Sequence, residues 1–129
     1  MSSFTDTLVV KKIDAHLWMV EREFTYHVGW EGNDEKVTVP AGFRTDFASV
    51  PRGLWNIFPP DGQYTQAAVL HDYLYYKQVY TRYKSDFIFY EAMGVLGVRG
   101  WVRSVMYCAV RSCGWIPWNR MKKEGRKWT

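Results

Sequence analysis

The sequence predicts an α+β fold: an N-terminal antiparallel β-meander of about four strands, followed by three α-helices, in a single compact domain. Runs of β-forming residues occupy the first forty positions, with apolar and polar residues alternating at 23–30, and apolar residues recur at spacings of three and four after residue 64. The chain has 129 residues, enough for one hydrophobic core. We expect this domain at residues 1–116 and a basic tail at residues 117–129.

The strands are expected in the first part of the chain, at residues 7–12, 16–21, 23–30 and 36–40. The first two are joined by a tight connection, which predicts a hairpin. In the third, Phe24, Tyr26 and Val28 fall on one face, the pattern of a half-buried strand. A turn at residues 32–34 leads to the fourth strand.

Three helices are expected after a break at residues 58–62, at about residues 64–79, 82–96 and 100–113. In the second, Phe89, Met93 and Leu96 share a stripe with Asp86, because spacings of three and four place residues on one helical face. The third is expected to end at Gly114. Its predicted inward stripe is Val102, Val105, Met106, Ala109 and Val110.

The charge of the chain is concentrated at its end. Residues 117–129 carry five basic residues and one acidic residue, which equals the net charge of +4 of the whole chain. This tail is either a solvated, frayed terminus or a contact for nucleic acid, an anionic membrane surface or an acidic partner. The seven Trp, nine Tyr and seven Phe also favour some surface aromatics that contact a partner.

The two cysteines and the apolar runs indicate the compartment. Cys108 and Cys113 lie five apart on the third predicted helix, which suits neither a disulfide nor a closed metal site, so we expect two buried free thiols in a reducing compartment. No apolar run reaches the roughly 18 residues of a membrane-spanning helix. Charged residues interrupt the N-terminal stretch, so no signal peptide is expected.

The segment from Thr45 to Pro51 suits neither a helix nor a strand. Asp46 and Ser49 lie three residues apart, and the side chains of both residue types can bond nearby backbone amides. The segment is therefore either an Asx-turn that connects the strands to the helices or a loop that presents Asp46 to a site.

His71 and Asp72 are neighbours on a predicted helix, so their side chains diverge by about 100° and each needs its own partner. Asp86, on the apolar stripe of the next helix, is the expected partner of His71, which would leave the other ring nitrogen free as a base. Asp72 would face the loops at residues 42–51 or 59–62 and bind a hard cation or cap loop amides. Alternatively, the same residues form a purely structural network closed by tyrosine hydroxyls.

These motifs resemble a phage-encoded family catalogued as domain of unknown function 1353. The resemblance rests on Thr45-Asp46-x-Ala48-Ser49-x-Pro51, Ala67-Ala68-x-x-His71-Asp72-x-Leu74-Tyr75, Asp86, Ala92-Met93 and Ala109-Val110-Arg111. It implies a protein of a tailed bacteriophage or prophage, located in the virion or the host cytoplasm. Its candidate binding residues are Thr45, Asp46, Ser49, Tyr75 and Arg111.

A local resemblance concerns chemistry. Ala68-x-x-His71-Asp72-x-x-Tyr75 followed by Asp86 is similar to the active-site helices of phospholipases A2. The resemblance implies that His71 is the catalytic base, that Asp86 orients it, and that Asp72 is the ligand of a divalent cation, calcium. The sequence departs from that family because it lacks an evident glycine-rich calcium loop and the disulfides of the secreted forms.

Three functions are compatible with these residues. The first is a virion component of the tail, neck or baseplate, or an assembly factor, which binds other phage proteins. The alternative is a His-Asp hydrolase, calcium-dependent in the phospholipase-like case, that acts on a lipid or on the cell envelope through His71 and Asp86. The third is a counter-defence protein that binds a host factor or a nucleotide signal.

Overall fold

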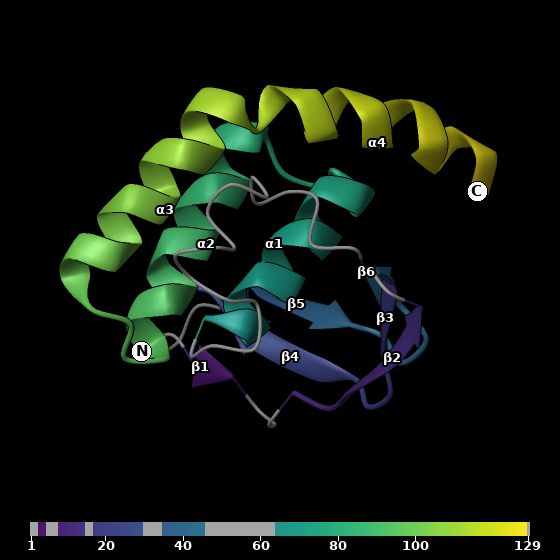
Figure 1. The fold of residues 1–129 in the computed structure, drawn as a ribbon, viewed down its shortest axis with the longest axis horizontal. Coiled ribbons are helices and arrows are strands. Elements are labelled where there is room, and N and C mark those ends of the chain that lie inside the picture. Colours follow the sequence, from purple (N-terminus) through teal and green to yellow (C-terminus); the bar gives the residue numbers. More distant parts are fainter. Residues whose placement is uncertain (1–2, 5–7, 15–16, 30–34, 46–63, 129) are drawn as a thin grey trace. The chain divides into compact units, whose positions relative to one another are not determined.

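A computed structural model describes residues 3–4, 8–14, 17–29, 35–45 and 64–128 of the chain (Figure 1). Antiparallel strands precede helices in this structure, so the predicted α+β class is confirmed. Packing divides the chain into two compact units, a strand unit at residues 1–46 and a helical unit at residues 47–129. The boundary between the units follows the last described strand.

Among the described residues, the strand unit contains two three-stranded antiparallel sheets. One has the order β1-β4-β5, with β1 at Ser3–Phe4, β4 at Phe24–His27 and β5 at Lys36–Val39. The other has the order β2-β3-β6, with β2 at Val10–Asp14, β3 at Leu17–Val20 and β6 at Arg44–Thr45. The four longer strands correspond to the four predicted ones, and β1 and β6 are additional.

The pairing of these strands differs from a single meander. The hairpins β2–β3 and β4–β5 are present, but β3 pairs with β6 and β4 pairs with β1. After β5 the chain turns back at Gly42, whose φ of +93° favours glycine. Hydrogen bonds from Gly42 N to Val20 O (2.7 Å) and from Val20 N to Phe43 O (2.8 Å) then hold β6 beside β3. Strands β3 and β6 are far apart in the sequence, so no local sequence pattern predicts that they pair.

The alternating strand β4 supplies much of the core of the strand unit. Phe24, Tyr26 and Val28 are at most 8% exposed, which confirms the predicted buried face. Phe24 lies opposite Val39 and Tyr26 opposite Val37, and both valines are buried too. Cross-strand pairs of aromatic and β-branched residues of this kind stabilise a sheet.

The described part of the helical unit contains four helices: α1 at Thr65–Lys77, α2 at Arg82–Val95, α3 at Gly100–Cys113 and α4 at Trp115–Trp128. The first three match the predicted ranges closely, whereas the predicted boundary between residues 116 and 117 falls inside α4. Helix α2 packs against both α1 and α3, and α4 packs against α1. No helix in the described residues is long and apolar enough to cross a membrane.

Helix α1 is the central element of the helical unit. Every residue from Gln66 to Asp72 is buried, as are Leu74 and Tyr75. Helix α2 is instead amphipathic, and Asp86, Phe89 and Met93 lie on its buried side, as predicted. The contact between α1 and α2 therefore brings the polar residues of both helices into the interior.

Helix α3 departs from the predicted inward stripe. Met106 and Val110 are buried, but Val105 is 41% exposed, and Cys108 and Cys113 are exposed. The prediction of an inward Val105 and two buried thiols is therefore wrong. Met106 and Val110 lie on the packed side of α3, whereas Val105 lies about 100° around the helix from Met106. The apolar residues of α3 therefore extend beyond its packed side.

Candidate functional site

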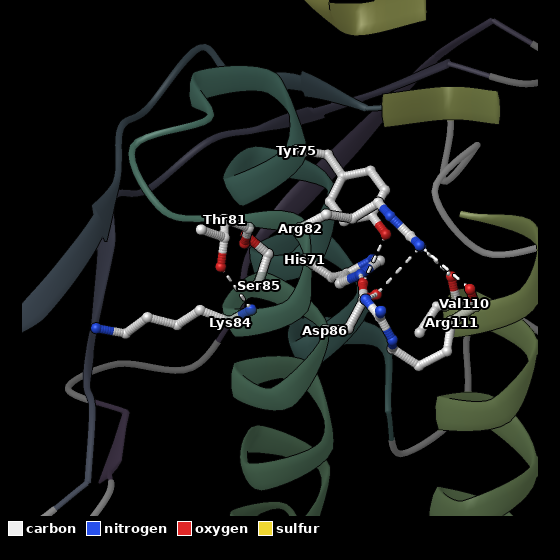
Figure 2. A network of polar contacts seen from close by, with 9 residues as sticks. All are labelled: His71, Tyr75, Thr81, Arg82, Lys84, Ser85, Asp86, Val110 and Arg111. Carbon is white, nitrogen blue, oxygen red and sulfur yellow. Dashed lines mark hydrogen bonds and ion pairs between the residues drawn. The ribbon is translucent and has the colours of Figure 1, made fainter. Parts of the chain in front are cut away.

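The candidate site is built on the contact between α1 and α2. His71 of α1 and Asp86 of α2 have fully buried side chains, and Nε2 of His71 lies 2.7 Å from Oδ1 of Asp86 (Figure 2). This is the contact that the sequence predicted. A carboxylate buried this deeply requires hydrogen-bond donors, because burial without them is unfavourable by several kcal/mol.

Both carboxylate oxygens of Asp86 have further partners from three helices. The hydroxyl of Tyr75, one turn after His71 on α1, donates to Oδ1 at 2.6 Å. Nη1 of Arg111 on α3 donates to Oδ2 at 2.9 Å, and Nη1 of Arg82, one turn before Asp86, lies 3.5 Å from the same oxygen. Two guanidinium groups therefore lie against one buried carboxylate. We name Asp86, His71, Tyr75, Arg82 and Arg111 the Asp86 cluster.

Arg82 also ties the cluster to the end of α3. Its Nη1 donates to the backbone carbonyls of Val110 and Arg111, each at 3.2 Å. These carbonyls belong to the last turn of α3, where a cation is favourable. The cluster therefore depends on the position of α3 as well as on the contact between α1 and α2.

The junction between α3 and α4 lies directly over Tyr75. A Cβ atom at Gly114 would overlap the carbonyl oxygen of Val110 and the hydroxyl of Tyr75, and it would lie 3.2 Å from Nη1 of Arg82. Beyond the junction, the ring of Trp118 meets the ring of Tyr75 edge-on with centroids 5.1 Å apart. Gly114 was predicted as the end of the helix, and the structure shows that its missing side chain also makes room for the cluster.

The protonation of His71 follows from this surrounding. An ionised carboxylate can only accept hydrogen bonds, so Nε2 of His71 carries the proton and Nδ1 carries the lone pair. Burial lowers the pKa of His71, and this effect exceeds the opposing effect of Asp86. His71 is therefore a neutral imidazole at neutral pH. Its buried Nδ1 has no hydrogen-bond partner among the described residues.

The imidazole ring is fixed as well as buried. Its centroid is 4.3 Å from the ring of Tyr75 and 4.6 Å from the ring of Phe89. Burial, together with Asp86, also raises the pKa of the Tyr75 hydroxyl, so that hydroxyl remains a donor across the physiological range. His71 is thus held in one tautomer and one orientation, as is required of a histidine base.

The other predicted site residues are distributed as follows. Tyr75 and Arg111 were candidate binding residues, and both contact Asp86. Thr45 is buried in β6 of the strand unit, and Asp46 and Ser49 lie outside the described residues. The alternative of an Asx-turn or a presenting loop for Asp46 therefore stays a prediction.

Asp72 is the predicted metal ligand. It is 2% exposed on α1, next to His71 in sequence. Within the described ranges, no group of three or more His, Cys, Asp or Glu side chains is placed to hold a metal ion. The metal role of Asp72 therefore stays a prediction.

Two residues of the site were not predicted from the sequence. Arg82 lies four positions before Asp86, a spacing that pairs opposite charges on a helix, so this signal was available. The role of Gly114 in clearing space for Tyr75 had no signal, because it depends on how α3 and α4 meet over α1.

Comparison with known proteins identifies the family. The profile of the family described as "Protein of unknown function (DUF1353)" matches residues 18–110, which is most of the chain. The chain belongs to this family. The DUF1353 match includes His71, Asp72, Tyr75, Asp86 and Arg82, and it ends just before Arg111.

A curated relative of this DUF1353 protein is the uncharacterized protein y4jT of Sinorhizobium fredii (strain NBRC 101917 / NGR234). It is 39% identical over 84 residues, which are 64% of this chain and 25% of the relative. The chain thus spans about a quarter of the length of that relative. No solved structure matches the chain.

Proposed function

We propose that the helical unit is a hydrolase in which Nδ1 of His71 is the general base. One observation carries the proposal: Nε2 is bound to Asp86, whereas Nδ1 is a lone pair without a partner among the described residues. A network with only a structural role has no use for that lone pair, because an unsatisfied buried acceptor lowers stability by about 1–3 kcal/mol.

In the proposed reaction Nδ1 receives and then releases a proton, while Nε2 stays bound to Asp86. Nδ1 takes a proton from water while the water oxygen forms a bond to the carbonyl carbon of an ester. The imidazolium that results is stabilised by Asp86, and it then gives its proton to the departing alkoxide as the bond from carbon to that oxygen breaks. The acceptor is an ester of a lipid or of the cell envelope.

Hydrolysis of a chromogenic ester and of phospholipid tests the proposal, each with calcium and with a chelator. In His71→Gln the side-chain amide can still donate to Asp86, but the lone pair of Nδ1 is lost. We expect a loss of about 100-fold or more in kcat with the fold retained. The matched control is His27→Gln in β4, which should retain full activity. Equal rates for wild type and His71→Gln on both substrates would contradict the proposal.

A second candidate function is a component of a phage particle that binds other phage proteins. It is supported by large apolar side chains that are 41–68% exposed in the helical unit, because such surfaces mark contact sites. Mass spectrometry of purified particles should then detect the protein at a copy number matched to another structural protein. Its absence from the particles would contradict this function while leaving the hydrolase proposal intact.

A further inference from the structure

Helix α3 has exposed apolar residues on the side opposite its buried ones. Met106 and Val110 are buried, whereas Trp101 is 60% exposed and Val105 is 41% exposed. The helical period places Trp101, Val105 and Cys108 on one side, turned away from Met106 and Val110. All three are exposed, so α3 has apolar residues on its outward side as well as its inward side.

The exposed apolar residues continue into the start of α4. Trp115 is 54% exposed and Ile116 is 51% exposed, at the point where α3 turns into α4 in Figure 1. We name Trp101, Val105, Cys108, Trp115 and Ile116 the outer face. Helix α3 alone is about 20 Å long. The outer face is therefore an extended apolar surface and not a few isolated exposed residues.

The part of the chain that carries the outer face is strongly basic. From residue 99 to the end, the sequence has eight Lys and Arg and one Glu, a net charge of +7, while residues 1–98 have a net charge of −3. Arg120 and Lys122 are exposed on α4, shortly after Trp115 and Ile116. The electrostatic complement of such a surface is an extended anionic one.

The composition of the outer face favours a membrane over a nucleic acid as its partner. Base stacking needs planar side chains with cations between them, but Val105 and Ile116 are aliphatic. The arginines of α3 are turned to α2 instead: the guanidinium of Arg103 is 4.8 Å from the ring of Tyr90, and that of Arg111 is 5.2 Å from the ring of Tyr83. Tryptophan and aliphatic residues on one side, with lysine and arginine beside them, are typical of a helix that lies in a lipid interface.

We propose that the outer face of α3 and α4 binds peripherally to an anionic lipid bilayer. Trp101, Trp115 and the aliphatic residues enter the headgroup region, and the cations of α4 remain at the lipid phosphates. Each basic residue near such a surface strengthens binding about fivefold. The proposal rests on surface residues alone, so it stands independently of the role of His71.

Co-sedimentation of the full chain with vesicles tests the proposal. Vesicles that contain phosphatidylglycerol should bind at least about tenfold more tightly than pure phosphatidylcholine vesicles, and high salt should weaken this binding. Tryptophan emission should shift to shorter wavelength on binding. No binding, or equal binding to both vesicle types, would overturn the proposal.

Surface variants locate the contact. Trp101→Ser should weaken vesicle binding about tenfold, and Lys122→Glu should weaken it to a similar degree because it reverses one charge. The matched controls are Val79→Ser, at a residue that is 68% exposed outside the outer face, and Lys77→Glu, at an exposed residue of α1. Both controls should bind as the wild type does, and controls that weaken binding as much as the test variants would overturn the assignment.

Two further measurements distinguish other occupants of the outer face. A single-stranded oligonucleotide that binds more tightly than anionic vesicles, and that loses its affinity in Trp101→Ser, would assign the face to nucleic acid. Sedimentation velocity that shows a dimer of the wild type and a monomer of Trp101→Ser would assign it to a second copy of the chain. Either result would overturn the membrane proposal.

Discussion

The Asp86 cluster and the outer face of α3 and α4 depart in opposite directions from the usual distribution of residues. The cluster places charged and polar side chains in the interior, with Asp86 and His71 fully buried. The outer face instead places tryptophan, valine and isoleucine at the surface. Buried polar groups and groups of exposed apolar residues are informative departures. A single exposed apolar residue is not, because such residues are common in folded proteins.

The difference lies in where the partners of each region are found. The two oxygens of Asp86 accept hydrogen bonds from residues of α1 and α3, so these partners are inside the chain. The outer face is exposed among the described residues, and the partner that we propose for it is a lipid surface outside the chain. The cluster is therefore expected to control stability, and the outer face is expected to control binding with little effect on stability.

Removal of the Asp86 carboxylate should give the largest effect. Asp86→Ala leaves two guanidinium groups, an imidazole N–H and a phenol O–H without their acceptor, and we expect the free energy of unfolding to fall by about 3–5 kcal/mol. Urea denaturation followed by circular dichroism measures this change. Glu91→Ala, at a half-exposed residue of the same helix, is the control and should change stability by less than about 1 kcal/mol. A similarly small loss for Asp86→Ala would mean that the carboxylate is not partnered as the structure has it.

The junction over Tyr75 should give an intermediate effect. In Gly114→Ala the added methyl group overlaps the Val110 carbonyl and the Tyr75 hydroxyl, so the free energy of unfolding should fall by about 1–3 kcal/mol. In Gly100→Ala the added Cβ has no neighbour within 4 Å, and alanine favours a helix. That control should be neutral or slightly stabilising. Equal effects at both glycines would show that the cluster does not constrain the junction.

The neutral state of His71 should make stability depend on pH. Its pKa in the folded chain is lowered by burial, so the unfolded chain binds the proton first as the pH falls. Its contribution is fully present above about pH 6.5 and is lost below it, by up to about 1.4 kcal/mol per pH unit. The free energy of unfolding between pH 5 and pH 7 measures this slope.

Two histidine variants show whether His71 causes this dependence of stability on pH. His71→Gln should reduce it, whereas His27→Gln in the strand unit should leave it unchanged. The wild type and the two variants have the same carboxylates, which titrate at lower pH. A difference in slope between them is therefore due to the histidine that was changed. Identical slopes for wild type and His71→Gln would mean that His71 is not held neutral by burial.

Local patterns in the sequence were sufficient for most elements of the fold. The ranges of α2 and α3 follow from spacings of three and four and from glycines at their ends, and the buried face of β4 follows from alternation. The pairing of β3 with β6 could not be predicted in this way, because these strands are joined across the whole β4–β5 hairpin. The register of that pairing depends on backbone bonds at Gly42 and Val20.

The candidate site was predictable where charge had to be compensated. A carboxylate on an apolar stripe requires a donor, and this requirement led from Asp86 to His71 before the structure was known. The same argument extends to Arg82 by its spacing of four, although the sequence does not show that it also contacts the end of α3. The position of Gly114 against Tyr75 could not be inferred, because the angle between α3 and α4 has no signature in their residues.

The smallest effect is expected within α3 itself, where the two regions lie on opposite sides of one helix. Val105 is 41% exposed on the outer face and Val110 is fully buried. Valine and threonine have similar shapes, so Val105→Thr and Val110→Thr differ mainly in whether a hydroxyl is buried. Val105→Thr should change the free energy of unfolding by less than about 0.5 kcal/mol, and Val110→Thr should lower it by about 1–3 kcal/mol. Urea denaturation of the two variants makes the comparison directly. A loss for Val105→Thr as large as that for Val110→Thr would mean that the outer face is part of the core, and the binding role assigned to it would then have no surface to act through.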